Sequence, residues 1–171
     1  MTHITPSPVW HPFAQHALTP HFPVVTRAEG AYLYTEDGKR FLDAISSWWV
    51  ITHRHCYPRI QTAIRQQTER LDQIIFANFT HEPAEELARH LVQITPSGLD
   101  YVFFSDSGST SIEVALKMAL GYWRCVGANR DRILVLQHSY HGDTVGAMSV
   151  GARGVFSQSY EPLLFGVETI P

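Results

Sequence analysis

The sequence predicts an α/β protein that begins with a small antiparallel meander and continues into the start of a mainly parallel sheet with packed helices. Short strand-like runs separated by Gly-containing turns indicate the meander between residues 23 and 45. From Pro58 the apolar residues recur at helical spacing, and a later strand–helix–strand succession indicates a βαβ unit. We therefore expect an N-terminal arm and meander over residues 1–55, followed by the beginning of a larger α/β domain over residues 56–171.

The meander is predicted from its turn residues. Glu29-Gly30 and Asp37-Gly38 are typical hairpin connections, because glycine adopts the positive φ that such turns require. The strands that these turns separate are residues 23–27, 31–34 and 40–44. Residues 1–22 are rich in Pro and His and lack periodicity, so we expect an extended arm there.

The larger part is predicted to alternate helices and strands. Its expected elements are helices over residues 58–71 and 83–94, a strand over 101–104, a helix that ends near 125 and a strand over 132–137. The helix before Cys125 is apolar on nearly every face, which predicts burial on more than one side. The continuous apolar strand 132–137 is expected to be buried on both faces. Residues 151–171 show little pattern.

Composition excludes several classes of protein. The 171 residues are 44% hydrophobic and 17% charged, which is typical of a globular protein. A net charge of −3 gives no reason to expect nucleic acid or an anionic membrane as a partner. No apolar run approaches the roughly 20 residues of a membrane span, and the N-terminus lacks the pattern of a secretory signal. Two cysteines cannot form a disulfide framework, which favours the cytoplasm.

The segment Ser105–Ser111 is the most informative local feature. It places small polar residues between a predicted strand and a predicted helix, where free backbone N–H groups at the positive end of a helix dipole can bind an anion. It lacks the lysine of a Walker loop and the three glycines of a dinucleotide fingerprint. A serine-hydrolase elbow with Ser107 as nucleophile and a simple helix N-cap remain as alternatives.

Three further segments give this turn a context. Trp10-His-Pro-Phe13 lies in the arm, Asp43-Ala-Ile-Ser-Ser-Trp-Trp49 follows the meander, and Ser139-Tyr-His-Gly-Asp-Thr144 follows the second predicted strand. Together with Asp106-Ser-Gly-Ser109 they resemble the class III pyridoxal-phosphate aminotransferases, over residues 10–150. The resemblance implies the N-terminal part of a fold-type-I transferase that uses pyridoxal 5'-phosphate.

The resemblance also implies a role for individual residues. Gly108 and Ser109 match the turn that holds the cofactor phosphate, and Tyr140 matches the aromatic residue that lies over the pyridine ring and borders the substrate. Trp48 matches a substrate-pocket residue. Phe13 falls where the family often carries a substrate-recognising tyrosine, so the ring is kept without the hydroxyl.

The Trp-His-Pro and Ser-Ser-Trp-Trp segments favour one branch of the class. That branch transfers an amino group from S-adenosylmethionine to 8-amino-7-oxononanoate in biotin synthesis, giving 7,8-diaminononanoate. Its members are homodimers, and these small molecules are the expected partners. Another ω-aminotransferase, of the ornithine or 4-aminobutyrate type, is the nearest alternative, and a non-catalytic association fragment is a further one.

One further departure and one absence qualify the resemblance. Arg54 stands where the family commonly has glycine. The chain has two lysines, Lys39 and Lys117, and neither matches the family position of the lysine that binds the cofactor covalently. We therefore expect the chain, taken as the N-terminal portion of a longer enzyme, not to transaminate alone. Ten scattered histidines without Cys-x-x-Cys spacing predict no metal site.

Overall fold

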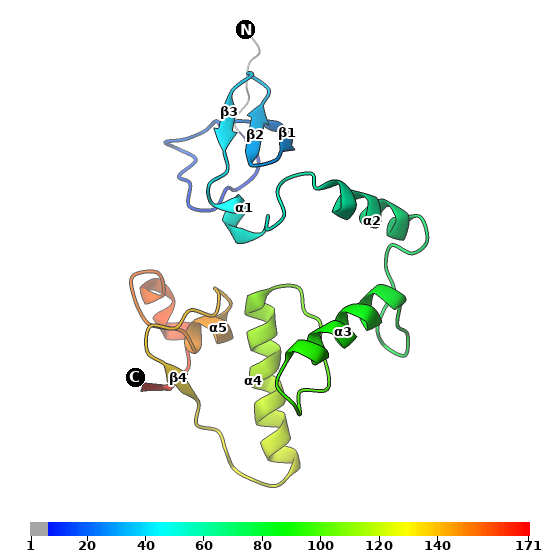
Figure 1. The fold of residues 1–171 in the computed structure, drawn as a ribbon. Coiled ribbons are helices and arrows are strands. Elements are labelled where there is room, and N and C mark those ends of the chain that lie inside the picture. The colour runs from blue at the N-terminus through cyan, green and yellow to red at the C-terminus, as the bar shows by residue number, and fades with distance from the viewer. Residues whose placement is uncertain (1–6) are drawn as a thin grey trace. The chain divides into compact units, whose positions relative to one another are not determined.

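A computed structural model describes residues 7–171 (Figure 1). The chain divides into two compact units, Met1–His81 and Glu82–Pro171, and each unit has its own sheet. Among residues 7–171, no helix combines the length and the apolar character needed to cross a membrane. The domain boundary expected after residue 55 stays a prediction.

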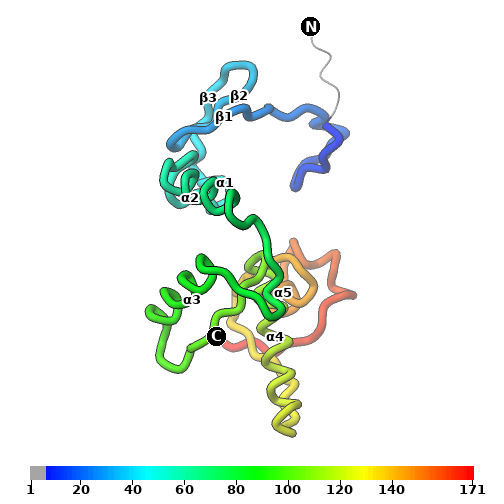
Figure 2. The backbone as a smooth tube through the Cα atoms, turned by 90° about the vertical axis from the view of Figure 1, so that its right-hand side faces the viewer, coloured from blue at the N-terminus to red at the C-terminus, as the bar shows by residue number. Residues whose placement is uncertain are grey.

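The first unit contains the predicted antiparallel meander. Its strands β1 (Val25–Glu29), β2 (Tyr32–Thr35) and β3 (Arg40–Leu42) lie side by side in chain order, as both views show (Figure 1, Figure 2). The two connecting turns are those predicted, and their glycines Gly30 and Gly38 have φ angles of 62° and 81°. Positive φ is accessible to glycine without steric cost, so these residues fix where the chain reverses.

The strands of the meander pair antiparallel, and the segment that follows them returns to the first hairpin turn. Leu33 of β2 lies opposite Ala28 on one side and Phe41 on the other. An isolated antiparallel bridge then joins Gly30 to His55, and the His55 N–H donates to the Gly30 carbonyl over 2.8 Å. This bridge ties the segment after the meander to the first hairpin turn.

Two helical elements follow the meander in the first unit. The short element α1 (Ser46–Trp49) has positive φ at every residue and is therefore a left-handed turn, not a regular helix. α2 (Pro58–Thr68) is regular and confirms the predicted helix, with Pro58 in its first turn. Proline suits that position because its missing N–H is one that the helix leaves without a partner.

The second unit begins with two helices. α3 (Glu82–Ile94) confirms the predicted second helix and carries Glu82 and Glu85 in its first turn, where the helix dipole favours negative charge. α4 (Gly108–Cys125) is the longest helix and begins four residues before the predicted apolar pattern. The expected burial of α4 on more than one side is wrong for the described chain, since none of its residues is buried.

The sheet of the second unit is a pair of parallel strands. The parallel pairing was predicted, but one of the two strands differs from the prediction. β4 (Leu134–Leu136) pairs with β5 (Glu168–Ile170), and the Arg132 Nε donates to the Glu168 carboxylate over 2.6 Å beside them. The strand predicted over residues 101–104 is not formed. Strand structure needs a neighbouring backbone, and the neighbour of β4 is β5, which lies in the part predicted to have little pattern.

The packed centre of the second unit lies around a short helix, α5 (Val145–Ser149). Ala147 and Ser149 have no exposed surface, and Val150 is nearly buried beside them. α5 packs against α4, and the 3-10 helix η1 (Gln158–Leu163) follows it in the chain. β4 contributes Val135, while its neighbours Leu134 and Leu136 are exposed, so the predicted burial of this strand on both faces is wrong.

Candidate functional site

The polar turn before α4 is an N-terminal cap with a specific hydrogen-bond pattern. The extended residue Ser107 is the N-cap, and its hydroxyl accepts a hydrogen bond from the Thr110 N–H over 3.2 Å. The Thr110 hydroxyl in turn accepts from the Ser107 N–H over 2.9 Å and from the Ser105 hydroxyl over 2.7 Å. This reciprocal capping box fixes where α4 begins.

The cap leaves the first two N–H groups of α4 available. An α-helix cannot satisfy its first N–H groups internally, and Ser107 satisfies that of Thr110, the third residue. The N–H groups of Gly108 and Ser109 precede it, at the positive end of the helix dipole. The turn therefore offers two backbone donors, with the Ser109 hydroxyl beside them, to a phosphate-sized anion.

The structure brings this turn into contact with the predicted Tyr-His-Gly segment. A Cβ atom placed on Gly142 would lie 1.8 Å from the Ser109 Oγ and 2.7 Å from the Ser109 Cβ. Gly142 also has a φ of 119°, a conformation that other residues rarely adopt. Glycine is thus required at this position on two counts, and its backbone lies directly against the serine of the turn.

A second contact joins the same two segments one helical turn further along. The Glu113 carboxylate, on α4, accepts hydrogen bonds from the N–H groups of Gly146 over 2.7 Å and Ala147 over 3.3 Å. These groups are the second and third residues of α5, so Glu113 caps α5 from another helix. A Cβ on Gly146 would lie 2.2 Å from the Glu113 Oε2, so any other residue there would displace the Glu113 carboxylate.

The Glu113 carboxylate is held ionised by its surroundings. The neighbouring Thr144 hydroxyl, followed by the Gly146 and Ala147 N–H groups, lowers the pKa of Glu113 from its ordinary value of 4.5. The Thr144 Oγ1 is buried and makes no hydrogen bond of standard geometry with the described residues, so it influences Glu113 by proximity.

Tyr140, the predicted ring-stacking residue, lies two residues before Gly142. Its side chain is largely exposed, at 74%, which leaves the ring face open to a ligand. Partial desolvation and the nearby Asp143 carboxylate raise the pKa of Tyr140, so the phenol stays protonated at neutral pH. In the second unit, the turn with Gly108 and Ser109 therefore lies against the backbone of the segment that contains Tyr140.

The first unit brings together the two residues predicted to recognise substrate. The rings of Phe13 and Trp48 are stacked, with centroids 5.5 Å apart and planes 12° apart. Trp49 meets Trp48 edge to face, with a centroid distance of 6.0 Å. All three side chains are mostly exposed, so together they form an aromatic surface. Phe13 contributes no hydroxyl to it.

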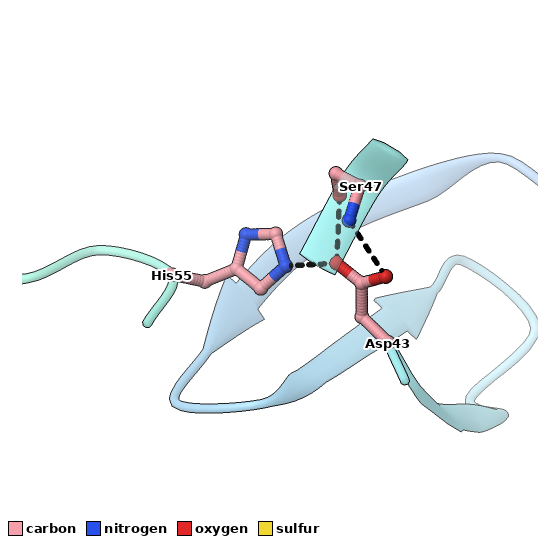
Figure 3. Close-up of polar contacts among 3 residues, drawn as sticks. All are labelled: Asp43, Ser47 and His55. Carbon is pink, nitrogen blue, oxygen red and sulfur yellow. Dashed lines mark hydrogen bonds and ion pairs between the residues drawn. The ribbon is translucent and has the colours of Figure 1, made fainter. Parts of the chain in front are cut away.

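The turn that carries the two tryptophans is held by a buried carboxylate (Figure 3). The Asp43 Oδ1 accepts from the Ser47 N–H over 2.9 Å, and the Oδ2 accepts from the Ser47 hydroxyl and the His55 Nε2, each over 2.7 Å. The Asp43 side chain is 5% exposed and that of His55 is 11% exposed. The Ser47 N–H and hydroxyl, then His55, lower the pKa of Asp43.

The order of these three groups excludes a nucleophilic triad. A serine nucleophile needs the imidazole between itself and the carboxylate, so that the imidazole can take the serine proton. Here Asp43 lies between Ser47 and His55, and both donate to it.

Among residues 7–171 no group of three or more His, Cys, Asp and Glu side chains could hold a metal ion.

The serine-hydrolase alternative for Ser107 is not favoured. Its hydroxyl is engaged in the capping box with Thr110, and no histidine or carboxylate among residues 7–171 forms a hydrogen bond with it. The two lysines are also accounted for. Lys39 pairs with Asp37 over 2.7 Å and holds the pKa of that aspartate at about 2, while Lys117 is exposed on α4.

Sequence reasoning did not find Asp43, His55, Glu113 and Gly146 as parts of these arrangements. A signal was present for Gly146 alone, because glycine often marks a position that other atoms approach closely. Arg54 has a φ of 74°, so the position where a glycine was expected does require glycine-like geometry.

Comparison with known proteins places the chain in a family. The model of the aminotransferase class-III family matches residues 13–171. The adenosylmethionine-8-amino-7-oxononanoate aminotransferase of Synechococcus elongatus is 51% identical over 163 residues, which are 95% of this chain and 38% of that protein. The enzyme of the same name from Buchnera aphidicola subsp. Baizongia pistaciae is 40% identical over 157 residues, 91% of this chain and 37% of that protein.

Solved structures agree with the family. The adenosylmethionine-8-amino-7-oxononanoate aminotransferase of Methanocaldococcus jannaschii has a TM-score of 0.87 and 36% identity, with 94% of this chain and 37% of that chain covered. An amine transaminase of an uncultivated Pseudomonas species, solved with pyridoxal phosphate bound, has a TM-score of 0.82 and 31% identity, with 96% and 38% covered. The fold is the fold-type-I α/β architecture of these pyridoxal-phosphate enzymes, and the chain spans less than two fifths of their length. The chain belongs to the class III aminotransferases.

Proposed function

We propose that this chain is the N-terminal portion of an aminotransferase that transfers an amino group from S-adenosylmethionine to 8-amino-7-oxononanoate, giving 7,8-diaminononanoate for biotin synthesis. The names of the relatives, at up to 51% identity, support this assignment. So does the Ser46-Ser-Trp-Trp49 segment, which distinguishes this branch from ornithine and 4-aminobutyrate aminotransferases. The complete enzyme would act in the cytoplasm as a homodimer.

The observation that carries the proposal is the contact between Ser109 and Gly142. It joins two segments that are separate in sequence and that both resemble cofactor-binding segments of the family. In the proposed enzyme, the N–H groups of Gly108 and Ser109 and the Ser109 hydroxyl hold the phosphate of pyridoxal 5'-phosphate. Charge-assisted hydrogen bonds of this kind are about twice as strong as neutral ones.

Tyr140 has a second role in the proposed site. Its exposed ring would stack on the pyridine ring of the cofactor and would border the substrate. When bound, pyridoxal phosphate supplies the electron sink that lets an amino group pass between carbon skeletons. The phenol stays protonated at neutral pH, so it can donate a hydrogen bond while the ring faces the cofactor.

Phe13 and Trp48 are proposed to recognise substrate. Their stacked rings form a flat apolar surface that suits an alkyl chain such as that of 8-amino-7-oxononanoate. The missing hydroxyl at Phe13 predicts that one hydrogen bond made by tyrosine-bearing relatives is absent here. Packing, not hydrogen bonding, would then dominate recognition at this position.

The covalent attachment of cofactor is assigned outside this chain. Lys39 is engaged with Asp37 in the turn between β2 and β3, and Lys117 lies two turns inside α4 on an exposed face. Both side chains are exposed, so neither amine lies in the desolvated apolar pocket that activates a nucleophilic lysine. We therefore infer that the 171 residues do not transaminate by themselves.

An amino-donor screen on a protein that contains this chain tests the assignment. The expected result is transfer to 8-amino-7-oxononanoate with S-adenosylmethionine as donor, followed by mass detection of 7,8-diaminononanoate. Ornithine and 4-aminobutyrate serve as alternative donors with 2-oxoglutarate as acceptor. Activity with either of these and none with S-adenosylmethionine would overturn the assignment while leaving the family unchanged.

A further inference from the structure

We infer that Asp43 and His55 are positioning residues for substrate recognition: they hold a left-handed turn, Ser46–Trp49, that presents Trp48 and Trp49. The inference deepens the proposed function and rests on it for the role of Trp48. Asp43 and His55 themselves offer little surface to a ligand, with side-chain exposures of 5% and 11%. Their effect must therefore pass through the residues that they hold.

The turn has a conformation that its sequence does not favour. Ser46, Ser47, Trp48 and Trp49 have φ angles of 50°, 46°, 64° and 68°. None of these residues is glycine, and consecutive left-handed residues are disfavoured because Cβ approaches the following carbonyl. Such a conformation persists only when surrounding contacts determine it.

Asp43 supplies the contacts that determine it. Both carboxylate oxygens are directed at Ser47, one to its N–H over 2.9 Å and the other to its hydroxyl over 2.7 Å. A right-handed turn would carry the Ser47 N–H away from this position. The two bonds to Ser47, drawn in Figure 3, therefore select the left-handed form.

His55 holds the same carboxylate through the Oδ2 atom that the Ser47 hydroxyl also contacts. Because the pKa of Asp43 is lowered, its carboxylate is ionised and can only accept, so the His55 Nε2 carries the proton and donates. His55 is itself anchored to the meander by its backbone bond to Gly30. The chain of contacts thus runs from the first hairpin turn through His55 and Asp43 to Ser47.

This series of contacts determines where the aromatic surface of Phe13, Trp48 and Trp49 lies. Trp48 follows Ser47 directly, and its ring is stacked on Phe13 with planes 12° apart. Relaxation of the turn to right-handed geometry would redirect both tryptophan side chains. The structure therefore assigns Asp43 and His55 to the geometry of Trp48, although neither residue has a place in the resemblance to the family's substrate residues.

Indole N–H signals in NMR spectra of the 15N-labelled 171-residue chain test the inference without substrate or cofactor. Trp48→Phe assigns the Trp48 signal, and Trp123 in the second unit serves as an internal reference. Asp43→Asn and His55→Phe are expected to shift the Trp48 and Trp49 signals and to leave Trp123 unchanged. His55→Gln, which keeps an N–H donor, is expected to restore the Trp48 signal in part.

Two controls separate positioning from a general loss of stability. His53→Gln changes the neighbouring exposed histidine and should move neither Trp48 nor Trp49. Thr35→Ala removes a buried hydroxyl that bonds Asp37 and the Lys39 carbonyl, so it weakens the meander at a distance from the turn. It should lower the unfolding temperature without shifting Trp48.

The outcomes are distinct. Unmoved Trp48 signals in both Asp43→Asn and His55→Phe overturn the inference, as do shifts no larger than those of Thr35→Ala. If Asp43→Asn unfolds the first unit, the comparison of His55→Phe with His55→Gln decides, because the bonds between Asp43 and Ser47 remain in both. Failure of the donor screen would instead remove the substrate role of Trp48 and leave this spectroscopic result intact.

Discussion

Glu113 and Gly146 are 33 residues apart in sequence and are joined by a 2.7 Å hydrogen bond from the Gly146 N–H to the Glu113 carboxylate. The bond joins α5 to α4. It lies one helical turn beyond Gly108 and Ser109, whose N–H groups are available to an anion. The Tyr140 segment, which leads into α5, is thereby tied to the same helix.

Replacing Glu113 with alanine should weaken the second unit. The substitution leaves two N–H groups of α5 without their cap, and loss of a helix cap lowers the free energy of unfolding by about 1 kcal/mol. Urea denaturation measures the change. Glu86→Ala, which removes an exposed glutamate from α3, is the matched control and should have a much smaller effect. Equal effects of the two substitutions would contradict the capping role.

Alanine at Gly142 or Gly146 should also destabilise the second unit. The new Cβ on Gly142 would lie 1.8 Å from the Ser109 Oγ and 2.7 Å from the Ser109 Cβ, so one of these two segments must move, whereas a Cβ on Gly146 would lie 2.2 Å from the Glu113 Oε2 and would displace that side chain from its capping position. Overlap and strain of this kind typically lower the free energy of unfolding by about 1–3 kcal/mol. Gly154→Ala is the control, because nothing lies within 4 Å of its Cβ position and its φ is not positive. A similar melting temperature for all three variants would refute the close approach.

Stability should depend on the ionisation of Glu113. Its pKa is lowered in the folded chain, so the unfolded chain binds a proton more readily. The stabilisation is fully present above the ordinary pKa of 4.5 and is lost as the pH falls through the lower, folded value. Denaturation between about pH 7 and about pH 3 should show a weaker pH dependence in Glu113→Gln than in the unmodified chain. An unchanged dependence would show that Glu113 is not responsible.

Glycine at position 54 should stabilise the first unit. Arg54 has a φ of 74°, a left-handed conformation that costs an L-residue roughly 1–2 kcal/mol. Glycine removes that strain but adds roughly 0.4–1 kcal/mol of entropy to the unfolded chain. The net expectation for Arg54→Gly is a gain of up to about 1 kcal/mol by thermal denaturation. Arg59→Gly, inside α2, should instead destabilise by about 1 kcal/mol.

Local chemistry made much of the fold predictable. Gly30, Gly38 and Pro58 each restrict the backbone by themselves, so the hairpin turns and the start of α2 could be read from the sequence. The small residues of the Ser105–Ser111 segment likewise predicted a helix start and an anion site. These predictions needed no knowledge of distant residues.

Features that depend on distant residues were not predictable. β5 forms because β4 lies beside it. Residues 101–104 form no strand because, within the described chain, no strand pairs with them. The left-handed turn at Ser46–Trp49 contradicts local preference and is imposed by Asp43 and His55. The residue pattern of a segment gives no information about the distant residues that contact it. The sequence therefore showed Trp48 and Trp49, but not that Asp43 and His55 orient them.

The measurement that tests the central claim most directly is the affinity of the chain for pyridoxal 5'-phosphate, compared with that for pyridoxal. If the N–H groups of Gly108 and Ser109 bind phosphate, the phosphorylated compound should bind more tightly. Ser109→Glu, which places a carboxylate at the same position, should weaken its binding by about tenfold or more. Ser97→Glu, in the exposed loop after α3, should have no effect. Equal affinity for the two compounds, or an unchanged affinity in Ser109→Glu, would contradict the assignment of this turn to the cofactor phosphate.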